Sequence, residues 1–225
     1  MLFSATFASG VLALLPSTIA APANDPSSSV TEITVRADQK HQKIEGFGFS
    51  GAFQRAQLLL NVTEEKQHEL VELLYSTETG VGFSMLRNGI GSSNSSYNDW
   101  MNTHLPESPG SPDGEFNYVW DEYDSGQLWL AQQAVKYGVD RIYGNAWSAP
   151  GFMKTNRDDA NGGLLCGVPG SEGACEYDWR QAYADYLVKY IQLYEKEGVK
   201  VSDIAWLNEP DLTYVYYFPP LMDYC

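Results

Sequence analysis

Asn208 and Glu209 are the residues of this 225-residue chain whose types and position best suit chemistry. The apolar residues 204–207 before them read as a buried strand, and Pro210 ends that strand because proline lacks an amide hydrogen and fixes its own φ. A carboxylate where a buried strand meets a loop suits proton transfer or nucleophilic attack in a cleft. A loop glutamate that caps the next helix is the alternative, and the pair alone does not decide.

A repeat of helix, Gly-Val dipeptide and apolar strand precedes this pair. Three helices, predicted to begin near residues 63, 125 and 178, end at Gly80-Val81, Gly138-Val139 and Gly198-Val199. Glycine adopts the left-handed conformation that closes a helix. The glycines lie 58 and 60 residues apart (138 − 80 and 198 − 138). Strands that alternate with helices at a steady interval predict βαβ units and a parallel sheet, with the first strand inside residues 44–53.

Each of the last three predicted strands carries a polar or aromatic pair at its carboxyl end. The pairs are Arg87-Asn88, Trp147-Ser148 and Asn208-Glu209. Parallel strands direct these ends to one rim, and a (β/α) barrel builds its active site at that rim. The long connections over about residues 88–124 and 148–177 would enclose a cleft there. This shared position favours a catalytic role for Glu209.

Composition and the amino-terminal segment bear on partners and location. The net charge of −15 argues against a nucleic-acid partner. Residues 1–20 resemble a secretory signal peptide, although no Lys or Arg stands at the front, and their apolar run is too short to span a membrane. We therefore expect a secreted, extracellular protein without a membrane span, and a monomer. Asn61 and Asn94 begin glycosylation acceptor sequences.

The cysteines and histidines indicate a disulfide but no metal site. Cys166 and Cys175 bracket a glycine-rich loop, which in an oxidising compartment suggests a local disulfide; two free thiols are the alternative. The remaining cysteine, Cys225, has no evident partner. The three histidines lack the spacing of metal ligands, and we expect them on surfaces or in loops: His41, His68 and His104. We expect neither a metal nor another cofactor.

Three segments together resemble a known family. They are Gly46-Phe47-Gly48-Phe49-Ser50-Gly51-Ala52-Phe53, Trp147-Ser148-Ala149-Pro150-Gly151-Phe152-Met153-Lys154 and Trp206-Leu207-Asn208-Glu209-Pro210. They are similar to glycoside hydrolase family 30, above all to its fungal secreted xylanase branch. The resemblance implies an α/β fold, a (β/α)8 TIM barrel, of which residues 44–212 would supply about the first four βα units. Residues 21–43 would be a linker followed, at 32–37, by the first strand of the family's side β-sandwich.

The resemblance also implies a retaining glycosidase acting on a β-linked polysaccharide, with (glucurono)xylan the first candidate. Glu209 matches the acid/base and Asn208 the residue that binds the sugar 2-hydroxyl. Arg87 matches a cleft arginine and Trp147 a wall of the sugar site; a structural salt bridge and core packing are the alternatives. Arg55 would grip the carboxylate of a glucuronic acid side group, unless it is a plain surface charge. Related branches cleave β-1,6-glucan, β-1,6-galactan or glucosylceramide.

The family's nucleophilic glutamate stands after a seventh strand, beyond the four that we find. Other carboxylates are present but none follows a predicted strand opposite Glu209: Glu45, Asp99, Asp158 and Asp159. Residues 213–225 lose the family pattern and read as the aberrant tail of a truncated or mis-spliced frame. We therefore expect the chain as written to be inactive and its complete relative to be active. A non-catalytic carbohydrate-binding fragment is the competing interpretation.

Overall fold

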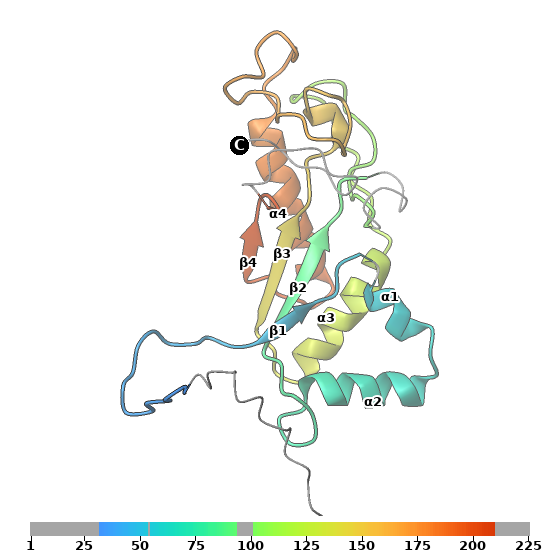
Figure 1. The fold of residues 1–225 in the computed structure, drawn as a ribbon. Helices are drawn as coiled ribbons and strands as arrows, with labels where there is room; N and C mark the ends of the chain where they lie inside the picture. Colours follow the sequence, from blue (N-terminus) through green and yellow to red (C-terminus); the bar gives the residue numbers. More distant parts are fainter. Residues whose placement is uncertain (1–31, 54, 94–100, 210–225) are drawn as a thin grey trace, which may run out of the picture. The chain divides into compact units, whose positions relative to one another are not determined.

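The computed structural model describes residues 32–53, 55–93 and 101–209. The chain divides into two units, residues 1–43 and 44–225, and the second contains the described helices and strands (Figure 1). In order these are β1 Gly48–Ser50, α1 Arg55–Leu60, α2 Glu64–Tyr75, β2 Met85–Ile90, the 3-10 turn η1 Asp124–Gly126, α3 Gln127–Lys136, β3 Arg141–Ala146, the 3-10 turn η2 Gly151–Met153, α4 Arg180–Lys196 and β4 Asp203–Ala205. The predicted signal peptide, Asn94 and the predicted tail lie outside the described residues.

The four strands form one parallel sheet in the order β1-β2-β3-β4 (Figure 1). The register aligns Ser50 with Arg87, Arg87 with Tyr143, and Tyr143 with Asp203. A helix separates each strand from the next, so the predicted βαβ units and parallel sheet are confirmed. Parallel neighbours in sequence order are what the first four units of a (β/α)8 barrel require.

The alternation of side chains along β2 and β3 gives the sheet two different faces. Leu86 and Ile142 are buried in the core that α2, α3 and α4 also form. Their neighbours Arg87 and Tyr143 point to the opposite face and are half-buried. A hollow of about 770 Å³ lies over this second face near the beginning of the strands. The polar side chains that could do chemistry therefore lie on the face away from the helices.

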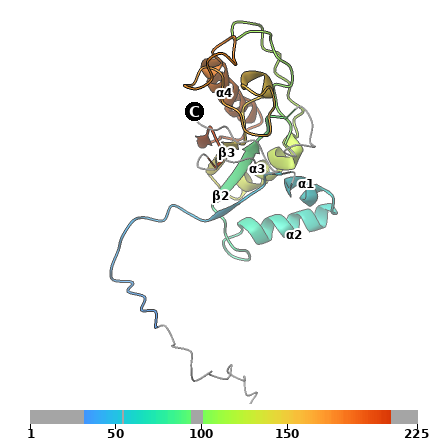
Figure 2. The same ribbon diagram turned by 45° about the horizontal axis from the view of Figure 1, so that its top comes forward.

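The helix boundaries follow the sequence signals at most places. The side chain of Thr63 caps α2 by accepting the backbone N–H of Lys66, as predicted. Gly138 and Gly198 have φ of 85° and 78° and follow the ends of α3 and α4. The prediction for Gly80 is wrong, because α2 already ends at Tyr75, capped by the backbone N–H of Ser76. Helix α1 lies against both α2 and α3 (Figure 2).

The strand predicted at residues 32–37 is not formed in this structure, and its place in a side β-sandwich stays a prediction. Residues 32–36 form no strand, and Ile33 and Val35 are 83% and 86% exposed. A strand is stable only beside a neighbour that completes its hydrogen bonds, and the described residues offer none to this segment. The first barrel strand, β1, is also shorter than the apolar segment at residues 44–53 suggested. Before β1, Ile44 and Phe47 remain exposed, so only three residues of the predicted apolar segment pair with β2.

Gln127 completes the edge of β2 where β1 ends. The N–H of Gly51 bonds to the carbonyl of Arg87, which is the last contact of β1 with this edge. Alternate residues of a strand direct their backbone groups to the same side, so Gly89 presents both its N–H and its C=O beyond β1. The side-chain amide of fully buried Gln127 binds both, with Oε1 accepting at 2.7 Å and Nε2 donating at 3.0 Å. One side chain thus replaces the missing strand and ties α3 to β2.

Replacing Gln127 with alanine should therefore destabilise the fold. Gln127→Ala leaves a buried N–H and a buried C=O without partners, at about 1–3 kcal/mol each. We expect the free energy of unfolding to fall by about 3 kcal/mol in urea denaturation followed by tryptophan fluorescence. The matched control is Gln133→Ala in the same helix, where the amide meets only the exposed Lys136. Equal losses in the two variants would show that Gln127 does not substitute for a strand.

Candidate active site

Four of the five predicted site residues come together: Asn208 and Glu209 after β4, Trp147 directly after β3, and Arg87 within β2. The Nη2 atom of Arg87 donates to Oδ1 of Asn208 at 2.8 Å. The guanidinium carbon of Arg87 lies 4.4 Å from the centre of the Trp147 ring, a distance at which a cation is attracted by the ring face. The negative charge of Glu209 acts on the same guanidinium. These four residues thus lie near one another, while their roles in binding and catalysis stay predictions.

Arg87 is the electrostatic centre of this group. Burial lowers the pKa of Arg87 from its usual value, while the neighbouring Tyr143 and Glu209 oppose that shift. An arginine stays protonated under all such conditions, so a fixed positive charge stands beside the Glu209 carboxylate. Glu209 itself is exposed and has a φ of 50°, a left-handed conformation that costs a non-glycine residue roughly 1–2 kcal/mol.

Arg87 lies deeper in the sheet than the sequence suggested. It is the third of six residues in β2, not the last, and the strand continues to Ile90. Asn88, paired with it in the sequence argument, faces the helices, where its Nδ2 donates to the hydroxyl of Tyr194 at 3.3 Å. Trp147 follows β3 directly but is only 3% exposed. Its ring therefore packs against the guanidinium of Arg87 and is not an exposed surface on which a sugar could lie.

Three further residues of this group were not predicted as site residues: Phe53, which ends the first family-like segment, and Tyr143 and Asn145, which belong to none of the three segments. The Phe53 ring meets Trp147 edge-on, with centroids 4.7 Å apart. Asn145 donates from Nδ2 to Oδ1 of Asn208 at 3.0 Å. The hydroxyl of Tyr143 donates to Oδ1 of Asn145 at 3.1 Å. The two-residue spacing of Tyr143, Asn145 and Trp147 along β3 was the available signal, because such residues share one face of a strand.

Two donors in the group are buried without a hydrogen-bond partner in the part of the chain that the structure describes. They are Nε of Arg87 and Nε1 of Trp147. A buried donor without an acceptor costs about 1–3 kcal/mol. Arg87 bonds to Asn208, and Trp147 packs against Arg87. The site therefore has unused capacity to donate hydrogen bonds, which suits a ligand rich in acceptor oxygens.

Comparison with known proteins gives the family. Residues 44–216 match the glycosyl hydrolase family 30 TIM-barrel domain. The catalytic domain of GH30 xylanase C from Talaromyces cellulolyticus is similar in structure, with a TM-score of 0.73 and 42% identity over 82% of this chain and 41% of that chain. This chain belongs to glycosyl hydrolase family 30.

Relatives of known name differ in substrate. An endo-1,6-beta-D-glucanase of Trichoderma harzianum is 30% identical over 75% of this chain and 34% of its own length. A putative glucosylceramidase 1 of Caenorhabditis elegans is 27% identical over 80% of this chain and 33% of its own length. The family 30 chain thus spans between a third and about two fifths of the length of these three relatives. Membership establishes a glycosidase family, and the substrate remains a matter for proposal.

The remaining predicted residues lie apart from the central group. Arg55 begins α1 and is exposed, and the hydrogen bonds that join Arg87, Asn145 and Asn208 do not involve it. The disulfide between Cys166 and Cys175 is confirmed and closes part of the connection after β3. Asn61 is exposed just after α1, which leaves its predicted glycosylation untested.

The described carboxylates named in the sequence argument do not supply a nucleophile. Glu45 precedes β1 and therefore lies at the amino-terminal end of that strand, whereas Glu209 follows the carboxyl end of β4. Asp158 is occupied within its own loop by the N–H of Ala160 and the side chain of Asn161. Asp159 belongs to the same loop, and Asp99 lies outside the described residues. We therefore assign the nucleophile of the family mechanism to none of them.

No group of three or more His, Cys, Asp or Glu side chains among the described residues is placed to hold a metal ion. No helix in this part of the chain is both long and apolar enough to cross a membrane.

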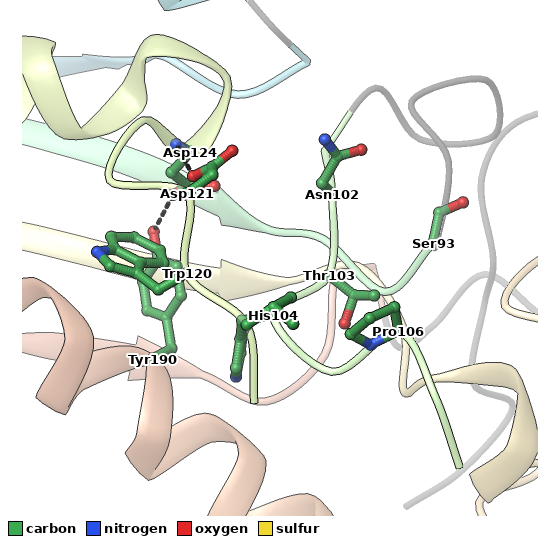
Figure 3. A pocket seen from close by; sticks show the side chains of 10 residues that line it. Ser93, Asn102, Thr103, His104, Pro106, Trp120, Asp121, Asp124 and Tyr190 are labelled. Atoms are coloured by element: carbon green, nitrogen blue, oxygen red, sulfur yellow. Dashed lines mark hydrogen bonds between the residues drawn. The ribbon is translucent and has the colours of Figure 1, made fainter. Parts of the chain in front are cut away.

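A second, separate cavity of about 330 Å³ lies between α4 and the connection after β2 (Figure 3). Asp124 is buried there and accepts hydrogen bonds from the hydroxyls of Tyr190 and Tyr194. His104 lies in a loop, as expected, but it is buried there and does not face solvent. Its ring stacks on Tyr186 at 4.0 Å between centroids, and Nε2 donates to the backbone carbonyl of that residue.

The two buried groups have pKa values shifted in opposite directions. Burial raises the pKa of Asp124 to about 7, against the hydrogen bonds from Tyr194, Tyr190 and Gln127 and with a smaller contribution from the charge of Asp121. Burial lowers the pKa of His104 to about 4; the bond to Tyr186 opposes the shift and the charge of Lys189 adds to it. Both side chains are therefore uncharged in the folded protein between about pH 4 and 7.

These shifts predict compensating effects of pH on stability. The raised pKa of Asp124 stabilises the fold fully below pH 3.8, and this contribution is lost as the pH rises through about 7. His104 acts oppositely: its neutral burial favours the fold above pH 6.5, and that contribution is lost as the pH falls towards about 4. Between about pH 4 and 6.5 the unfolded chain binds one proton more at His104 and one fewer at Asp124 than the folded protein does. The effects of the two groups on the pH dependence of stability therefore cancel.

In the variant Asp124→Asn, the pH dependence of stability that His104 causes should no longer be cancelled. Relative to the wild type, the free energy of unfolding of this variant should fall by about 1.4 kcal/mol for each pH unit from 6.5 to 4.5. Urea denaturation at pH 4.5, 5.5 and 6.5 measures this difference. The exposed Asp113→Asn is the matched control. Parallel pH profiles for Asp124→Asn and the wild type would contradict the assigned pKa shift.

Proposed function

We propose that the rim around Asn208 and Glu209 binds a β-linked polysaccharide, with (glucurono)xylan as the preferred class, and supplies the acid/base carboxylate of a retaining glycosidase. The observation that carries this proposal is the hydrogen bond from Arg87 to Asn208, the residue next to Glu209, whose charge also acts on Arg87, in a chain of family 30. The 42% identity to a xylanase catalytic domain favours xylan over the substrates of the glucanase and glucosylceramidase relatives, which are 30% and 27% identical.

In this mechanism Glu209 transfers the protons. Its carboxyl group protonates the leaving glycosidic oxygen, and the resulting carboxylate then removes a proton from the water that hydrolyses the glycosyl-enzyme intermediate. A second carboxylate, about 5–5.5 Å away, attacks the anomeric carbon in retaining enzymes. The fixed charge of Arg87 and the amide of Asn208 would orient the sugar next to Glu209. The whole protein would act outside the cell, as the signal-like residues 1–20 suggest.

Two other functions stay open. One is hydrolysis of β-1,6-glucan, β-1,6-galactan or glucosylceramide by the same residues. It draws support from the fungal endo-1,6-glucanase and the nematode relative named above. The other is carbohydrate binding without turnover. It draws support from the lack of an assigned nucleophile among the described carboxylates.

Binding and turnover by the 225-residue chain can be separated directly. We expect retardation in affinity electrophoresis through gels that contain xylan or glucuronoxylan, and weaker retardation by β-1,6-glucan. We also expect no release of reducing ends, because no second carboxylate is assigned. Hydrolysis of glucuronoxylan by the pure chain would contradict the second expectation. Binding to none of these polysaccharides would refute the proposed function.

The role of Glu209 is best tested inside a complete barrel. Residues 44–209 would replace the matching segment of the xylanase C catalytic domain. Glu209→Gln should lower kcat on xylan by about 10²–10⁴-fold, the usual contribution of a general acid or base. An aryl β-xyloside with an acidic phenol should form the intermediate almost unimpaired and release a burst of phenol, because its leaving oxygen needs no proton. The exposed Glu195→Gln is the control, and equal losses of phenol release and xylan hydrolysis would exclude the acid/base role.

The same chimera tests Arg55. If Arg55 grips a glucuronic acid carboxylate, Arg55→Ala should lower kcat/KM on glucuronoxylan by about 10-fold or more while it leaves unsubstituted xylan nearly unchanged. Lys66→Ala removes a comparable exposed charge from α2 and serves as the control. Equal effects of Arg55→Ala on the two xylans would make Arg55 a plain surface charge.

A further inference from the structure

Asn208 is held from two strands at once. Its Oδ1 atom accepts from Nη2 of Arg87 on β2 at 2.8 Å and from Nδ2 of Asn145 on β3 at 3.0 Å. The Oδ1 atom of Asn145 accepts in turn from the hydroxyl of Tyr143 at 3.1 Å. Asn145 is 2% exposed, so its two polar ends are committed to these contacts. The result is a line of three hydrogen bonds across the mouth of the sheet.

The direction of every hydrogen bond in this line follows from Arg87. A guanidinium only donates, so the Asn208 atom that it touches must be the amide oxygen. Because that oxygen also meets Asn145, the atom that Asn145 presents must be its amino nitrogen. The carbonyl oxygen of Asn145 then faces Tyr143, whose hydroxyl must donate. Reversing either amide would place two acceptors or two donors against each other.

We propose that Asn145, itself held by Tyr143, is a positioning residue that together with Arg87 locks the amide oxygen of Asn208 and leaves its Nδ2 amino group to donate to a sugar hydroxyl. The inference rests on the proposed polysaccharide function. Asn208 then offers the ligand a donor and not an acceptor, so it selects a ligand oxygen that can accept. This matches the two other unused donors nearby, Nε of Arg87 and Nε1 of Trp147.

The arrangement explains why position 145 carries an amide. Asn145→Asp keeps the shape of the side chain but removes the donor, so a carboxylate oxygen would face Oδ1 of Asn208. If Asn208 then rotated to offer its amino group, that group would oppose the guanidinium of Arg87. Either outcome costs about one hydrogen bond, which corresponds to roughly a fivefold loss of sugar affinity at about 1 kcal/mol.

The experiment is a double-mutant cycle on the 225-residue chain with xylohexaose as the probe, measured by isothermal titration calorimetry. Asn145→Asp should weaken binding about fivefold when Asn208 is present and by less than about twofold in the Asn208→Ala background. The exposed Asn61→Asp, which adds the same charge elsewhere, should leave binding unchanged. Equal factors in the two backgrounds would show that Asn145 does not act through Asn208, and would overturn the proposal.

A second measurement follows the amide groups without any sugar. In the wild type, the side-chain NH₂ of Asn145 should exchange slowly with solvent in nitrogen-15 NMR spectra, since it is buried and bonded. Tyr143→Phe should accelerate that exchange several-fold, whereas the exposed Tyr137→Phe should not. Unchanged exchange in Tyr143→Phe would overturn the role of Tyr143.

The two measurements separate this proposal from the proposed function. If the wild type binds xylohexaose but the cycle shows no coupling, the positioning role fails and the function stands. If the wild type binds neither xylohexaose nor the polysaccharides, the function fails and the role in sugar binding fails with it. The NMR exchange then still reports whether Tyr143 holds Asn145.

Discussion

The guanidinium of Arg87 is the constraint on which the candidate site depends. It is a cation that cannot lose its proton, it lies over the ring of Trp147, and it binds the oxygen of Asn208. Because it can only donate, it determines which atom each neighbouring amide presents. Burial costs such a charge part of its hydration, and the ring, the amide and the carboxylate of Glu209 offset that cost. A lysine at this position would carry the same charge but would not impose the same planar geometry.

The sheet gives Arg87 its position. Its side chain shares a face with Tyr143 because the strands are parallel and in register, and the opposite face is buried against the helices. Apolar residues on the face towards the helices hold β2 and β3 in place. Gln127 binds the backbone of β2 beyond the last residue paired with β1. The site is thus built on strand residues whose backbone is restrained from both sides. Such restraint suits a group whose hydrogen bonds must keep one direction.

The cavity beside α4 follows a different physical rule. Asp124 and His104 are both buried, and the described charges that act on them, Asp121 and Lys189, disfavour the charged form of each. Each remains neutral at mildly acidic pH, and each exchanges a proton on unfolding with the opposite sign. The two costs of burying an ionisable group compensate between about pH 4 and 6.5. This tolerance comes from the pair, since either group alone would make stability depend on pH.

The sequence alone determined the features that arise from neighbours along the chain. The cap at Thr63, the left-handed glycines Gly138 and Gly198, the disulfide between Cys166 and Cys175 and the alternation of strand and helix all depend on local conformation or short spacing, so a single segment reveals them. Position on a common rim followed from the same alternation. Only the tertiary structure decided that residues 32–36 form no strand, that His104 is buried and that Arg87 stands in mid-strand. It alone joined Asn145 to Asn208, 63 residues further on. Such contacts depend on which strands become neighbours and which face each side chain takes. That outcome belongs to the packing of the whole sheet and not to any one segment.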